Sequence, residues 1–86
     1  MIQQINEPVE IIAAHKRAGV KLIPRLMEWN HRLYKFTQVG FRHPTTKGQR
    51  TIHVLSVSDE SATYRLEFDS YNLIWTLQEI SDGLPN

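Results

Sequence analysis

The sequence predicts an all-β protein: a single small antiparallel meander of five to six strands, forming a curled sheet or a partly open barrel. Residues 27–36 place apolar side chains two apart on either side of a two-residue turn. Residues 63–69 alternate strictly between apolar and charged or polar side chains. Short clusters of Gly, Asn, Asp and Ser separate the apolar runs, as they do in hairpin-connected sheets.

The chain has 86 residues and no cysteine. This length predicts one domain over residues 1–86 with one modest core, and we expect loose termini at residues 1–8 and 82–86. The lack of cysteine excludes a disulfide, a zinc site with thiolate ligands and a thiol nucleophile. The N-terminus has no basic run followed by a long apolar stretch, so we expect a cytoplasmic protein with no membrane partner.

The first element can be interpreted in two ways. Asn6 before Glu7 and Pro8 is a plausible helix start, and Gly19 a plausible stop, which gives a short N-terminal helix. The β-branched residues of the segment and Pro8 favour instead a strand over residues 9–14 that opens at an edge of the sheet. We favour the strand, followed by a basic loop from His15, and keep the helix as the alternative.

The central hairpin is the best defined element of the sequence. Asn30 and His31 form the expected two-residue turn, because asparagine tolerates the left-handed backbone that such turns require. The cross-strand pairs are then Trp29 with Arg32, Met27 with Tyr34, and Arg25 with Phe36. Met27, Trp29 and Tyr34 therefore share one face with Phe36, and we expect that face to cover the core.

Residues 32–44 are long for one strand, and their parity changes. Tyr34 and Phe36 are even-numbered, whereas Val39 and Phe41 are odd-numbered. One extra residue, near residues 37–38 or at Gly40, must redirect the side chains, and such a bulge would bend the sheet.

The second half of the chain predicts three further strands. A polar loop over residues 44–49 leads into a strand at 51–58 whose apolar residues point both ways, which indicates burial on both faces. A strand at 63–69 follows, and a turn over residues 69–72, in which Asn72 can take the left-handed conformation, leads to the last strand at 73–80. Trp75 and Leu77 of that strand are predicted to lie in the core.

Three stretches resemble a family of small bacterial domains of unknown function: Pro8-Val9-Glu10, Trp29-Asn30-His31-Arg32-Leu33-Tyr34, and Tyr64-Arg65-Leu66-Glu67 leading through Asp69 to Trp75. In that family Pro-Val-Glu opens the chain, an aromatic residue and a Gly-Arg-x-Tyr turn form a central hairpin, and a last hairpin ends Asp-x-x-x-x-x-Trp. His31 and Leu73 stand where the pattern usually has glycine. Some similar domains occur near DNA-repair polymerase genes. The resemblance therefore implies a β fold without catalytic residues and slightly favours nucleic acid as a partner.

Charge is distributed unevenly along the chain. Residues 1–50 carry a net charge of +6 and residues 51–86 one of −5, although the whole chain is only +1. If the halves lie on different sides, the domain has a basic face and an acidic face. If the sheet brings them together, the opposite charges form cross-strand pairs instead. The candidate binding residues are Lys21, Arg25, Arg32, Lys35, Arg42, Lys47 and Arg50.

Catalysis and metal binding have little support in the sequence. None of the four histidines is spaced from another His or a carboxylate as metal ligands usually are, and no nucleophile elbow or Gly-rich phosphate loop occurs. We therefore expect no enzyme, no cofactor and no metal site.

Two binding hypotheses remain. A basic curved sheet with interleaved aromatic residues could contact nucleic acid, the aromatic residues being Trp29, Tyr34, Phe36 and Phe41. Alternatively, an exposed edge strand, with residues 9–14 as the first candidate, and the charge asymmetry could serve a protein partner or self-association.

Overall fold

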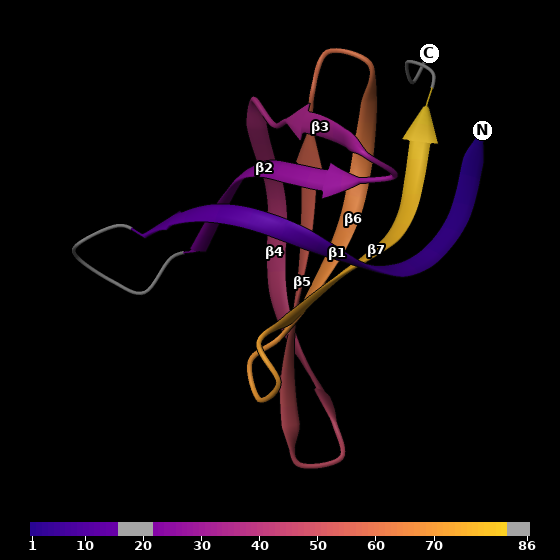
Figure 1. The fold of residues 1–86 in the computed structure, drawn as a ribbon. Coiled ribbons are helices and arrows are strands. Elements are labelled where there is room, and N and C mark those ends of the chain that lie inside the picture. Colours follow the sequence, from indigo (N-terminus) through magenta and orange to yellow (C-terminus); the bar gives the residue numbers. More distant parts are fainter. Residues whose placement is uncertain (16–21, 83–86) are drawn as a thin grey trace.

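The computed structural model describes residues 1–15 and 22–82, and in these residues the fold is one unclosed antiparallel sheet of seven strands (Figure 1). The strands are β1 (Ile2–His15), β2 (Leu22–Trp29), β3 (Arg32–Lys35), β4 (Gln38–Lys47), β5 (Arg50–Ser58), β6 (Ala62–Asp69) and β7 (Ile74–Asp82). Their order across the sheet is β3-β2-β1-β7-β6-β5-β4. The all-β prediction is confirmed. The count of five to six strands is too low because residues 32–44 divide into β3 and β4 around residues 36–37.

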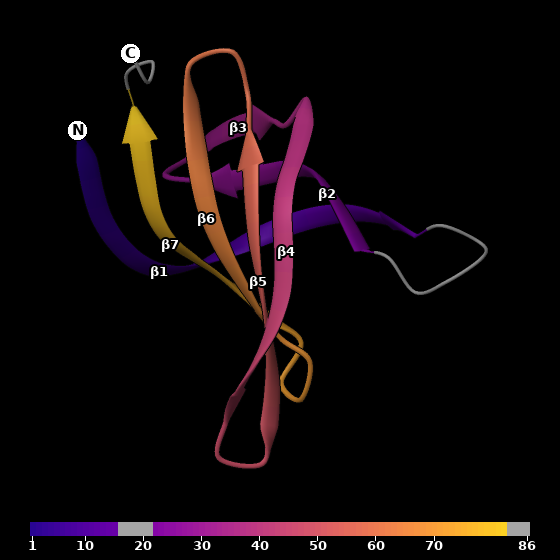
Figure 2. The same ribbon diagram turned by 180° about the vertical axis from the view of Figure 1, so that it is seen from behind.

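The sheet folds over itself into two crossing layers. In Figure 1, β2, β3 and the second half of β1 run across β4–β7, and Figure 2 shows the same crossing from behind. β1 joins the layers because its residues 2–9 pair with β7 and its residues 10–15 pair with β2. The register with β7 shifts between Gln4 and Glu7, and Asn6 between them has a φ of 54°. Such a bulge lets a strand bend from one layer into another that crosses it.

This path of β1 confirms the favoured strand over residues 9–14. The alternative helix is wrong for the described part of the segment, and Asn6 lies in a bulge rather than at a helix start. Residues 2–8 are not a loose terminus, because they pair with β7. Among the described strands, residues 10–15 pair with β2 alone and residues 2–9 with β7 alone, so residues 10–14 keep one unpaired side, although the strands at the two ends of the sheet order are β3 and β4. Of the expected loose C-terminus, Asp82 ends β7, and residues 83–86 lie outside the described part.

The core lies between the two layers. Met27 from β2 and Leu55, Leu66 and Leu77 from β5–β7 are almost completely buried. Phe68 and Trp75 sit beside them with ring centroids 4.7 Å apart. The core positions predicted for Met27, Phe36, Trp75 and Leu77 are confirmed; Trp29 and Tyr34 are half-buried against the same cluster. Ile52 and Val54 are also buried but belong to the opposite face of β5, as the double-sided pattern of that strand predicted.

The turns confirm the central hairpin and correct two others. Asn30 and His31 have φ values of 52° and 62°, and Trp29 pairs with Arg32 as expected. The predicted loop at 44–49 is wrong: β4 continues to Lys47, and only residues 48–49 form the turn before Arg50. In the β6–β7 turn the left-handed residue is Leu73, with a φ of 59°, and not Asn72.

The expected bulge near Gly40 is present. The register of β4 with β5 shifts between Val39 and Arg42, so Gly40 and Phe41 lie together opposite Ser56. A Cβ on Gly40 would approach the Ser56 carbonyl oxygen to 3.4 Å, so the two strands are closely apposed there.

Candidate binding surfaces

The layer formed by β1, β2 and β3 has one face toward the core and one toward solvent. Successive strand residues point to opposite faces, so Ile11, Met27 and Tyr34, which pair in one row, face the core. The neighbouring rows face outward. We call this outward set the hairpin face; its rows are Glu10, Glu28 and Leu33, and Ile12, Leu26 and Lys35.

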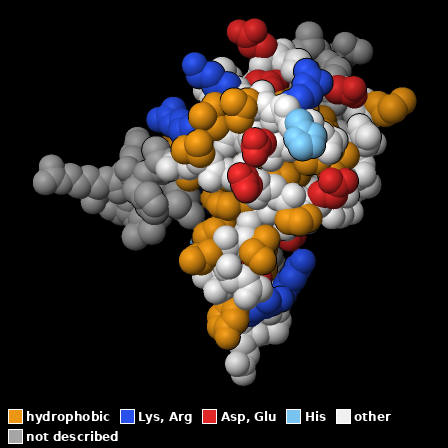
Figure 3. Space-filling model, in the orientation of Figure 1, with side chains coloured by type: hydrophobic (Ala, Val, Ile, Leu, Met, Phe, Trp, Pro, Cys, Tyr) orange, Lys and Arg blue, Asp and Glu red, His pale blue; other side chains and the backbone are white. Residues whose placement is uncertain are grey.

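Aliphatic side chains of the hairpin face are open to solvent. Ile12 is 62% exposed and Leu33 is 70% exposed, and Leu26 lies half-buried between them in the middle strand. In Figure 3, which views this side of the molecule, hydrophobic side chains lie beside a group of acidic ones. An apolar patch rimmed by charge is typical of a surface that contacts another molecule.

Two carboxylates of the hairpin face oppose each other. Glu10 and Glu28 are direct cross-strand partners on β1 and β2, and both are exposed. Within the described residues neither makes a hydrogen bond or an ion pair. Like charges placed directly opposite each other destabilise a sheet, so this pair costs stability that nothing in the described structure recovers.

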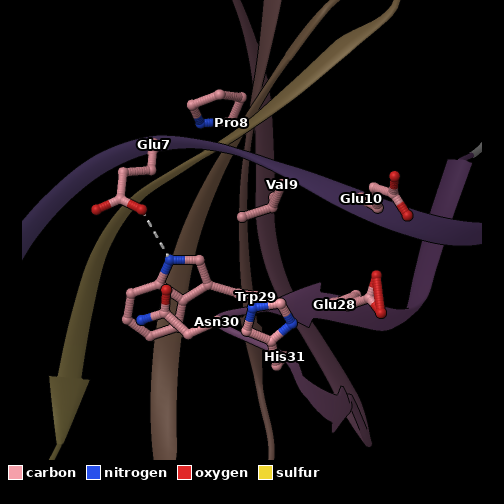
Figure 4. Close-up of a pocket in the computed structure, with 8 residues that line it drawn as sticks. All are labelled: Glu7, Pro8, Val9, Glu10, Glu28, Trp29, Asn30 and His31. Carbon is pink, nitrogen blue, oxygen red and sulfur yellow. Dashed lines mark hydrogen bonds between the residues drawn. The ribbon is translucent and has the colours of Figure 1, made fainter.

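A hollow of about 450 Å³ adjoins these carboxylates. Its lining includes Glu7, Glu10, Glu28 and Trp29, as Figure 4 shows. The Trp29 indole Nε1 donates a hydrogen bond of 3.1 Å to Glu7 Oε1, which fixes the indole at the wall of the hollow. In Figure 4, Glu7 lies beside the Trp29 indole at one end of the hollow, and Glu10 and Glu28 lie at the other end. Carboxylates at either end suit a cationic group.

The predicted basic residues do not form one face. Arg25, Arg32 and Lys35 are exposed on the β2–β3 hairpin. Lys47 and Arg50 lie at the far end of the molecule, next to the β4–β5 turn (Figure 1). They pair with acidic residues of β6, Lys47 Nζ at 3.6 Å from Glu67 Oε1 and Arg50 at 3.2 Å from Asp69 Oδ2.

The two other predicted residues add little to such a face. Arg42 is half-buried on β4 opposite Leu55, and Lys21 lies outside the described residues. Lys47 and Arg50 of the basic half of the chain thus form ion pairs with carboxylates of the acidic half. This is one of the two arrangements expected from the uneven charge distribution.

The predicted stacking aromatics are mostly engaged with one another. Trp29 and Tyr34 are 6.1 Å apart between centroids, Tyr34 and Tyr64 5.7 Å, and Phe36 and Tyr64 5.3 Å. These rings form part of the core. Phe41 is exposed, but it stacks on His43 at 5.4 Å on the outer surface of β4.

One titratable pair is held by the β5–β6 turn. Burial and a hydrogen bond to Asp59 raise the pKa of the Tyr64 hydroxyl far above its usual value. Partial burial acts to raise the pKa of Asp59, but hydrogen bonds from the Tyr64 hydroxyl and from the Ser61 and Ala62 amides outweigh it and lower the pKa. The geometry is that of a structural brace, since the hydroxyl points to the turn and not to a cleft.

The described residues hold no metal cluster and no membrane-spanning helix. No group of three His, Asp or Glu among the side chains that the structure describes is placed to hold a metal ion. No helix of the described chain is long and apolar enough to cross a membrane.

The chain matches no protein-family model, no curated protein and no solved structure. The hairpin face was missed at the level of sequence. The sequence did contain an indication of it. Leu26 and Leu33 are each adjacent in sequence to a core residue, Met27 and Tyr34, so on a strand they point to the opposite face.

Proposed function

We propose that this protein is a non-enzymatic binding module that docks a basic, partly apolar protein segment on the hairpin face. The observation that carries the proposal is the conjunction of exposed Ile12 and Leu33 with the opposed carboxylates of Glu10 and Glu28. A Lys or Arg side chain placed between the carboxylates would relieve their repulsion. Aliphatic side chains beside it would bury Ile12 and Leu33.

The hollow extends this surface. A cationic side chain that enters it can meet Glu10 and Glu28 at one end or Glu7, beside Trp29, at the other. Docking would thus combine apolar contact with charge pairing, as many interfaces do.

Nucleic acid is the second candidate, supported by the exposed side chains of Arg25, Arg32 and Lys35. Two features favour the protein segment. Among the described residues of the β1–β2–β3 layer, Glu7, Glu10 and Glu28 balance the charge of these three cations, which weakens the attraction of this surface for a polyanion. The rings of Trp29, Tyr34 and Phe36 also pack with the core, which leaves few faces for base stacking.

A titration followed by ¹⁵N–¹H NMR separates the candidates. The probes are a peptide of alternating Arg and Leu, a matched peptide of alternating Glu and Leu, and a short single-stranded oligonucleotide. We expect the Arg-Leu peptide to shift the amides of Glu10, Ile12, Glu28 and Leu33, and the other two probes to leave them unchanged. Shifts caused by the oligonucleotide and centred on Arg25, Arg32 and Lys35 would replace this proposal with the nucleic-acid function, and equal shifts by both peptides would refute the role of the carboxylates.

A further inference from the structure

The β6–β7 turn displays a leucine in a conformation that suits glycine. Leu73 has a φ of 59°, and its side chain is 72% exposed. A bulky residue in the left-handed region is sterically strained. Burial within the chain does not offset this strain, because most of the side chain faces solvent.

The turn is held by several hydrogen bonds despite that strain. Asp69 Oδ1 accepts hydrogen bonds from the amides of Tyr71 at 2.9 Å and Asn72 at 3.3 Å, and the Leu73 amide donates to the Asp69 carbonyl at 2.7 Å. Ser70 donates through its hydroxyl to the Thr51 carbonyl at 3.0 Å, which ties the turn to β5. A turn whose backbone is held in this way loses less conformational entropy on binding than an unconstrained one.

Three apolar side chains project from this turn. Tyr71 is 77% exposed, and Leu73 and Ile74 are exposed as well. We call Tyr71, Leu73 and Ile74 the turn knob. Aromatic and aliphatic side chains on a preorganised turn resemble the anchors that dominate protein interfaces.

A hollow of about 200 Å³ lies directly beside the knob. Ile52, Ile74 and Thr76 line it, and Ile52 is buried although no second layer of described residues covers this face of β5. Its lining also carries both signs of charge, as the ion pairs of Lys47 with Glu67 and of Arg50 with Asp69.

We infer that the turn knob binds a second copy of this chain, with Leu73 of each copy seated in the hollow of the other. Ile74 belongs to both the knob and the hollow, so the two features lie side by side, as a two-fold symmetric contact requires. Because Lys47 and Arg50 are paired with carboxylates of their own chain, two copies meet here without an excess of like charge. Removing Leu73 from water is the gain that offsets its strained backbone. This contact is separate from the hairpin face and does not depend on the function proposed above.

Sedimentation velocity over concentrations up to about 1 mM, where small interfaces begin to associate, tests this contact. We expect the parent to dimerise and Leu73→Asn to weaken the dimer about tenfold or more, as loss of an interface anchor does. Asparagine tolerates the left-handed backbone, so the fold is kept. The matched control is Leu33→Thr, which removes an equally exposed leucine from β3 and should leave dimerisation unchanged.

Leu73→Gly separates strain from contact. At dilutions where the parent is monomeric, the Tm of Leu73→Gly should equal or exceed that of the parent. At higher concentrations Leu73→Gly should dimerise as weakly as Leu73→Asn. A parent that remains monomeric at all concentrations, or a dimer that tolerates both Leu73 variants, would overturn the inference.

Discussion

The Tyr64 hydroxyl donates a hydrogen bond of 2.8 Å to Asp59 Oδ2, and this contact connects the core to the β5–β6 turn. Tyr64 is buried, and its ring packs against those of Tyr34 and Phe36. Asp59 in turn accepts hydrogen bonds through Oδ1 from the amides of Ser61 and Ala62. The Asp59 carboxylate therefore links the β5–β6 turn to the aromatic cluster of the core.

Tyr64→Phe should lower the free energy of unfolding at neutral pH by roughly 1.5 kcal/mol, the usual contribution of a hydrogen bond to a charged group. The pKa of Asp59 is lowered in the folded state, so its contribution is present above the unfolded pKa of about 4 and is lost as the pH falls through the lower folded value. Urea unfolding at several pH values should show the difference between parent and Tyr64→Phe narrowing in acid. A difference independent of pH would contradict this role of Asp59.

Trp75→Ala should cost about 3–5 kcal/mol, as expected when a large aromatic side chain is removed from a core. Trp75 is 9% exposed and lies against Phe68. Tyr71→Ala is the matched control, because that ring is exposed and should change stability by no more than about 0.5 kcal/mol. Chemical denaturation of both variants measures the contrast, and similar losses would show that Trp75 is not in the core.

Asn6→Val should destabilise the fold by about 1–2 kcal/mol, because a β-branched residue fits poorly at positive φ. Asn6→Gly should be tolerated. Gln3→Val, on the regular part of the same strand, serves as the control and should have little effect. Urea unfolding of the variants measures the difference. If Asn6→Val and Gln3→Val changed the free energy of unfolding equally, the bulge at Asn6 would not be the feature that positions β2 and β3 over the core.

Local pairing was predictable from the sequence, whereas long-range pairing was not. The turn at Asn30 and His31 fixes the register of β2 and β3 through adjacent residues, and alternation identifies β6. The path of β1 depends instead on pairing with β7, more than sixty residues away, and on a bulge at Asn6 that looks like a helix cap in sequence. Intrinsic preferences cannot express such a tertiary constraint.

The same limit affected the candidate site. The sequence lists the cations of the candidate site, but it could not show that Lys47 and Arg50 lie beside Glu67 and Asp69. Their pairing depends on the two-residue turn after Lys47, which extends β4 along β5. The hairpin face could not be predicted either, because it requires β1 to pair with β2 and so place Glu10 opposite Glu28.

The most direct test of the binding account is Glu28→Gln, measured both for stability and for affinity toward the Arg-Leu peptide. Removing one of two opposed carboxylates should raise the free energy of unfolding by about 0.2–1 kcal/mol. The same change should weaken peptide binding severalfold, whereas the control Glu60→Gln, in the exposed β5–β6 turn, should alter neither quantity. Stability gained together with affinity lost is the result that the account predicts, and a Glu28→Gln variant that binds the peptide as tightly as the parent would contradict it.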